Sequence, residues 1–272
     1  DSEEGLILVD INTLADGEFR NNFFKRSLTW NEGSVLDGAR HITLAGHLAY
    51  ITTAHGLTVI DLDKPLKPRH VITVPMNDAR ASALQFRYLW VTDADGVKLF
   101  NVTDMENPVA VPSGTIPLHN ARRLYLARTY AYIAAKDEGL VIANITRPEA
   151  PTIYLKETFG GTMSDAEDVI VGYTNATLFA YVADGRNGLK VVQLTTPDSQ
   201  KNYYGFSPAP KPELIAFART PEPALALSKG LDRDRAVDET GGQMAVFGRL
   251  GSRPFTRGEM QRFYLNSKGM PY

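Results

Sequence analysis

The chain has 272 residues, of which 43% are hydrophobic and 22% charged, and its formal net charge is −2 at pH 7. This composition is ordinary for a folded protein with a sizeable core. The small net charge gives no general electrostatic reason to bind nucleic acid or anionic membranes. The absence of cysteine excludes disulfides, thiolate metal sites and a cysteine nucleophile within the chain. No apolar run approaches the ~18 residues of a membrane span, so none is expected.

A repeat runs through the sequence at intervals of roughly 40–55 residues, the range of four-stranded propeller blades. Its clearest marker is a glycine that opens an apolar run. An aromatic residue precedes this glycine by six or seven positions in four repeats, and an alanine lies further upstream. The glycines are Gly5, Gly56, Gly96, Gly139, Gly188 and Gly242.

The markers divide the chain into repeat units of about 1–38, 39–78, 79–120, 121–165, 166–223 and 224–272. The first unit opens directly on a third strand at Gly5–Ile11, so it is expected to be incomplete. The third unit shows four strands at Arg80–Phe86, Tyr88–Asp93, Val97–Val102 and Val109–Ile116. The strands are nearly continuous apolar runs, as in sheets that are buried on both faces.

The fifth unit contains a hairpin at Thr177–Leu194 and an outer strand at Leu214–Ala218 between prolines. The last unit is degenerate, with Arg235 at the aromatic position and a short helical turn expected at 256–263. Together these patterns predict an all-β fold and a single domain over 1–272: a β-propeller of six four-stranded blades, or seven, with the first blade incomplete.

The segments GLTVIDLDKPLKP, GVKLFNVTDMENP, GLVIANITRPEAP and GLKVVQLTTPDSQ resemble the LVIVD repeat, a β-propeller repeat. This resemblance implies an exported protein, periplasmic or on the cell surface, that often forms part of a larger chain. It supplies no catalytic residues. The N-terminal residues lack the basic and apolar regions of a signal peptide, so we expect a mature chain or a fragment.

The candidate binding site lies where the innermost strands begin, because a propeller brings these positions together around its central channel. Arg40, Arg80 and Arg122 are expected to converge there and to attract a carboxylate, a phosphate or an acidic loop of a partner. The alternative is that these arginines pair with Asp37, Asp78 and Asp165 and close the channel structurally. The further site candidates are Asp37, Asp78, Asp165, Glu167, His119 and Arg186.

The Asp93-Ala94-Asp95-Gly96 segment is a weak calcium candidate, since alternating carboxylates can ligate calcium. No glutamate follows at EF-hand spacing, and Asp-Gly is typical of a tight hairpin turn, so we expect a turn and no cofactor. The five histidines form no metal-binding motif.

The sequence therefore favours a non-enzymatic recognition or scaffolding module that binds a protein partner or a small anion. A hydrolase or lyase that uses aspartate and histidine on the same face is the alternative. A third interpretation is a docking module of a larger exported redox or surface protein, which would place other segments of a parent chain among its partners.

Overall fold

The computed structural model describes residues 1–10, 25–173, 178–196, 207–228, 249–250, 253–254 and 266–268. The chain separates into two compact units, Asp1–Leu227 and Ser228–Tyr272. In the second unit, β20 (Arg249–Leu250) pairs antiparallel with β21 (Arg253–Pro254). The helical turn expected at 256–263 and the degenerate markers Arg235 and Gly242 lie outside the described residues. A single domain over 1–272 therefore stays a prediction.

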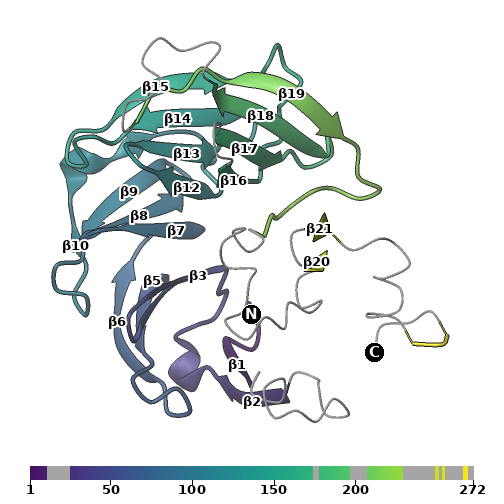
Figure 1. Ribbon diagram of the computed structural model, residues 1–272. Coiled ribbons are helices and arrows are strands. Elements are labelled where there is room, and N and C mark those ends of the chain that lie inside the picture. Colours follow the sequence, from purple (N-terminus) through teal and green to yellow (C-terminus); the bar gives the residue numbers. More distant parts are fainter. Residues whose placement is uncertain are drawn as a thin grey trace. The chain divides into compact units, whose positions relative to one another are not determined.

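The first unit consists of antiparallel sheets whose strands follow one another in chain order (Figure 1). Two strands form the first sheet, and each later sheet falls within one predicted repeat unit. The first two sheets contain β1 (Leu6–Asp10) and β2 (Lys25–Trp30), then β3 (His41–Ala45), β4 (Leu48–Thr53), β5 (Gly56–Asp61) and β6 (Arg69–Pro75).

The next three sheets repeat the same order of strands. Their members are β7 (Ala81–Gln85), β8 (Tyr88–Asp93), β9 (Gly96–Asn101), β10 (Val109–Ala110) and β11 (Ile116–Pro117); β12 (Leu124–Ala127), β13 (Tyr130–Ala134), β14 (Leu140–Asn144) and β15 (Thr152–Glu157); and β16 (Asp168–Tyr173), β17 (Leu178–Ala183), β18 (Leu189–Thr195) and β19 (Glu213–Ala218). Short 3₁₀ turns lie at Glu32–Ser34 and Pro112–Gly114.

The first strands of successive sheets lie beside one another: β3 contacts β7, β7 contacts β12, and β12 contacts β16. The outer strands of these sheets lie on the opposite side (Figure 1). Apolar side chains fill the spaces between neighbouring sheets, and β4 and β8 are buried along their whole length. This burial on both faces explains the continuous apolar runs of the sequence. The fold is all-β and propeller-like, as predicted.

The repeat glycine begins the third strand, where the backbone passes very close to the outer strand. At Gly96, φ is +135° and an added Cβ would lie 2.1 Å from the Ile116 carbonyl oxygen. At Gly56 the same approach is made to the Val74 oxygen, at 2.2 Å. A side chain cannot fit at such distances, so the spacing of the glycines reflects the packing of third strand on outer strand.

The hairpin predicted at Thr177–Leu194 is formed by β17 and β18, which are the two middle strands of the fifth sheet. The predicted strand at Leu214–Ala218 is also confirmed, and it pairs with β18 as the outer strand. In the first sheet, the described residues contribute β1 and β2. The incomplete first blade stays a prediction.

The continuous outer strand predicted at Val109–Ile116 is wrong. Two short strands, β10 and β11, both pair with β9, and the turn at Pro112–Gly114 separates them. Pro112 has no backbone N–H to donate to a ladder, which favours leaving the strand at this point.

Candidate functional site

A polar pocket of about 290 Å³ lies where the first strands of successive sheets begin. We call it the arginine pocket. Several of its residues occupy one repeat position, directly after the repeat alanine. Leu225 extends this set into the chain beyond the fifth sheet. The lining residues are Arg40, Asp78, Arg80, Arg122, Arg123, Glu167 and Leu225.

Asp78 joins two of the predicted arginines. It pairs with Arg40 and accepts a hydrogen bond from Arg80 Nε at 2.8 Å. Burial alone would raise the pKa of Asp78, but the hydrogen bonds from both arginines outweigh burial and lower it. Arg80 also donates to the Ala121 carbonyl oxygen at 3.0 Å, so it links the third sheet to the start of the fourth. Both arginines therefore pair with Asp78, and neither pairs with Asp37 or Asp165 in the described part of the chain.

The Arg122 guanidinium makes fewer hydrogen bonds to described residues than that of Arg80. Its Nε lies 3.3 Å from Glu167 Oε2, but this buried atom makes no hydrogen bond to a described residue. Glu167 pairs more closely with Lys136, which also lies 2.6 Å from Asp165. The hydrogen bond from Lys136 is the largest cause that lowers the pKa of the Asp165 carboxyl. Arg122 consequently keeps a donor that no described protein group uses.

Arg123 lines the arginine pocket although the sequence did not single it out. Its guanidinium has no hydrogen bond or ion pair with another residue in the described part of the chain. With Arg123 included, four arginines face two carboxylates across the lining, which leaves an excess of positive charge. Arg123 could have been suspected from the sequence because it directly follows Arg122. Only Arg122 occupies the repeat position after the alanine.

Four other predicted site residues lie outside the pocket lining: Asp37, His119, Asp165 and Arg186. Asp37 accepts a hydrogen bond from Asn31 Nδ2 at 2.7 Å, and the His119 backbone N–H lies 3.3 Å from Glu138 Oε2. The Arg186 backbone N–H donates to Asp165 at 3.2 Å. The turns between second and third strands do lie beside the strand starts, since Asn120 donates to the Ala94 carbonyl and Lys136 bridges to Ala166.

The acidic turn at Asp93 and Asp95 is stabilised by the chain itself. The Asp95 backbone N–H donates to Asp93 Oδ1 at 2.8 Å, and Lys98 Nζ lies 3.8 Å from Asp93 Oδ2. Among the described residues, no group of three or more histidine, aspartate or glutamate side chains is arranged to hold a metal ion. The geometry is that of a hairpin turn, and the calcium candidate gains no support.

The hydrolase or lyase alternative needs histidine and aspartate side chains that meet around one pocket. The arginine pocket contains no histidine. In the parts of the chain that the structure describes, no hydrogen bond joins the side chains of His55, His119, Asp95 and Asp165. No observation therefore favours the enzymatic alternative. Within the same parts of the chain, no helix is long and apolar enough to cross a membrane.

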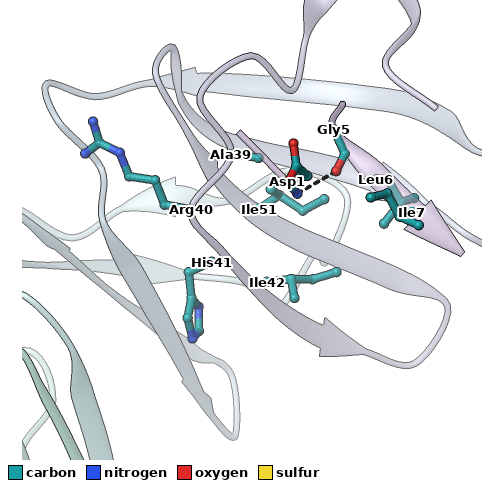
Figure 2. A pocket seen from close by; sticks show the side chains of 9 residues that line it. All are labelled: Asp1, Gly5, Leu6, Ile7, Ala39, Arg40, His41, Ile42 and Ile51. Carbon is teal, nitrogen blue, oxygen red and sulfur yellow. Dashed lines mark hydrogen bonds between the residues drawn. The ribbon is translucent and has the colours of Figure 1, made fainter. Parts of the chain in front are cut away.

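A second pocket, of about 320 Å³, lies between β1 and the start of β3 (Figure 2). Its walls are mainly apolar, and the chain folds back beside it, where the Asp1 amino group donates to the Gly5 carbonyl at 2.7 Å. His41 also lines this pocket, and its Nδ1 accepts a hydrogen bond from the Ser82 backbone N–H at 3.2 Å. Burial, and secondarily the charge of Arg123, lower the pKa of His41 to about 4.

This histidine predicts a loss of stability in acid. Because the pKa of His41 is lower in the folded state than the unfolded value of 6.5, the unfolded state binds more protons between pH 6.5 and pH 4. Stability should be fully present above pH 6.5 and fall by about 3 kcal/mol as the pH drops to about 4. Urea unfolding across this range should show a shallower pH dependence for His41→Ala. His70→Ala, at an exposed histidine on β6, is the control, and equal slopes in His41→Ala and wild type would contradict the prediction.

The family model of the LVIVD repeat matches residues 120–156 and 165–197, which correspond to the fourth and fifth sheets. The predicted resemblance is confirmed over these residues, which carry the LVIVD repeat. No curated protein matches it in sequence.

Among solved structures, a functionally unknown protein from Desulfotomaculum acetoxidans DSM 771 is similar, with a TM-score of 0.53 and 13% identity over 86% of this chain and 71% of that chain. The computationally designed Ika4 protein has a TM-score of 0.43 and 14% identity over 60% of this chain and 94% of that chain. A chain of the nidogen/laminin complex has a TM-score of 0.42 and 10% identity over 73% and 89% of the two chains. The first of these likenesses supports the propeller-like fold alone.

Proposed function

We propose that this protein is a non-enzymatic binding module of the propeller type, and that the arginine pocket holds an anionic group. The group is a carboxylate or phosphate, supplied either by a small anion or by an acidic segment of a protein partner. The observation that carries this proposal is that two guanidinium groups of the pocket keep donors for a ligand. Arg123 makes no hydrogen bond or ion pair within the described residues, although its charge opposes the burial that raises the pKa of Asp168 and adds to the burial that lowers the pKa of His41. Arg122 Nε is buried without a hydrogen bond to a described residue.

The surrounding contacts support a preformed site. Arg80 is only 11% exposed and is held by Asp78 and the Ala121 carbonyl, so the pocket wall is fixed before any ligand arrives. Guanidinium groups bind carboxylates and phosphates through charge-assisted hydrogen bonds, which are stronger than neutral ones. A ligand would therefore use Arg122 and Arg123, while Arg40 and Arg80 shape the pocket.

The test measures binding of citrate, inorganic phosphate and a hexaglutamate peptide by isothermal titration calorimetry, in wild type and in the double variant Arg122→Gln/Arg123→Gln. One of the three probes should bind at low salt, and the double variant should weaken it by roughly 10- to 100-fold, because two charge-assisted hydrogen bonds are removed. Binding of citrate or phosphate would indicate a small anion, and binding of the peptide alone would indicate an acidic protein segment.

The matched control is Arg69→Gln, at an exposed arginine of β6 that pairs with Asp61 on another part of the surface. It changes the net charge without touching the arginine pocket, and it should leave affinity within about twofold. If none of the probes binds wild type, or if the double variant binds as tightly as wild type, the proposal is wrong and the pairing with carboxylates is the whole role of these residues.

The number of blades and the cellular context belong to the same proposal. Equivalent repeat positions of five successive units, Arg40, Arg80, Arg122, Glu167 and Leu225, meet at one pocket. This favours five sheets around the pocket, fewer than the six or seven expected from sequence. The LVIVD resemblance favours an exported module, with docking to other segments of a parent chain as a further role.

A further inference from the structure

The interruption of the outer strand in the third sheet opens a separate pocket. Phe100 pairs with Ala110 and Val97 pairs with Ile116, so two residues of β9 face five residues of the outer segment. The second sheet is more regular: opposite Val59 and Ile60 of β5, only one residue of the outer strand β6 has no partner. A pocket of about 410 Å³ lies beside the interrupted strand, between this segment, the end of β6 and the Asp93–Gly96 turn.

The fifth sheet shows what occupies the same place when the outer strand is continuous. There, Asp184 and Lys190 form an equivalent pair, with Lys190 Nζ 3.8 Å from Asp184 Oδ2. The ring of Phe217 on β19 lies 5.3 Å from this ammonium, and the Asp184 side chain has no solvent exposure. In the third sheet no strand residue faces Lys98, and its side chain is 32% exposed. The lysine of the pair is therefore covered in the fifth sheet and partly exposed in the third, where it lines a pocket together with the largely buried Asp93.

The walls and the polar end of this pocket have different chemistry. Met76, Phe100, Val111 and Pro112 supply apolar surface, while Asp93, Asp95 and Lys98 supply the charges. The two carboxylates outnumber the single ammonium. Burial is the largest effect on Asp93 and raises the pKa of its carboxyl, although Lys98 and the Asp95 backbone act in the opposite direction. The volume is within the usual range of small-molecule sites.

We propose that this pocket binds a small organic ammonium compound, with its apolar body against Met76, Phe100 and Val111 and its ammonium group beside Asp93 and Asp95. The excess of carboxylates selects a cation over an anion of the same shape. In this proposal, Asp93 and Asp95, which resemble part of a calcium motif, bind an organic cation. The apolar wall of the pocket would contribute nothing to binding a metal ion. This site is separate from the arginine pocket and does not depend on it.

The experiment compares three probes with the same phenyl body: phenethylamine, phenethyl alcohol and 3-phenylpropionate. Ligand-observed saturation-transfer NMR and calorimetry on the full chain should show the amine binding at least about tenfold more tightly than the propionate. Asp93→Asn keeps the acceptor oxygen for the turn and should weaken the amine about tenfold. Ala110→Trp, at an exposed position of the rim, should also weaken it by blocking the pocket.

Asp63→Asn is the matched control, because it removes one exposed carboxylate outside the pocket and should change affinity less than twofold. Circular dichroism identifies any variant that fails to fold, and if Asp93→Asn does so, Ala110→Trp decides the outcome. The proposal is overturned if phenethylamine does not bind at ~10 mM, if the propionate binds as tightly as the amine, or if the folded pocket variants bind like wild type.

Discussion

Gly96→Ala is expected to destabilise the protein by about 3 kcal/mol or more, because two costs combine at this position. The backbone φ of +135° is unfavourable for any residue with a side chain, and the new Cβ would lie 2.1 Å from the Ile116 carbonyl oxygen. That oxygen belongs to the backbone of β11, so relief requires moving one strand away from β9. Urea unfolding followed by circular dichroism measures the loss.

Gly46→Ala is the comparison at a glycine with a positive φ and open space around it. Gly46 also has a positive φ, +60°, but nothing lies within 4 Å of the position that a Cβ would occupy. This variant should lose about 1 kcal/mol, the cost of conformation alone. Equal losses in the two variants would contradict the role of close packing and would leave backbone conformation as the sole reason for the repeat glycine.

The repeat made much of the fold predictable because its markers have direct physical causes. The repeat glycine is required where the third strand passes close to the outer strand, and the apolar runs are required because the strands are buried between neighbouring sheets. The interruption at Pro112–Gly114 was missed although Pro112, Ser113 and Gly114 are turn-forming residues, because the segment Val109–Ile116 has the length of an ordinary outer strand. Only the register of β10 and β11 on β9 shows the extra residues.

The sequence predicted where three arginines of the candidate site lie, but not which carboxylates they contact. The repeat alanine placed Arg40, Arg80 and Arg122 at the start of the first strands, and all three line one pocket. The sequence could not show that Asp78 forms ion pairs with two arginines, or that Lys136 pairs with Asp165 and Glu167. These pairings depend on how far each side chain extends between neighbouring sheets. The prediction from sequence also missed Arg123, which lies one residue beyond the repeat position.

Trp90→Ala is expected to cost about 3–5 kcal/mol, the usual range for truncating a large aromatic residue in a core. Trp90 has no solvent exposure and belongs to the apolar cluster between the third and fourth sheets, together with Leu99, Leu124 and Ile133. Truncation would leave a cavity that rigid strands on both sides cannot close. The midpoint of urea unfolding, followed by circular dichroism, should fall accordingly.

Trp90→Tyr tests whether the aromatic position of the repeat is a shared packing site, since tyrosine occupies it in the second sheet as Tyr50. The Tyr50 hydroxyl donates to the Met105 carbonyl at 2.8 Å, in the connection of the adjacent sheet. A tyrosine at position 90 loses volume and must find its own acceptor, so we expect a loss of about 1–2 kcal/mol. Phe86→Ala is the control, because Phe86 is 92% exposed and its removal should change stability by less than about 0.5 kcal/mol. If Trp90→Ala is no more damaging than Phe86→Ala, the apolar cluster does not hold the third and fourth sheets together.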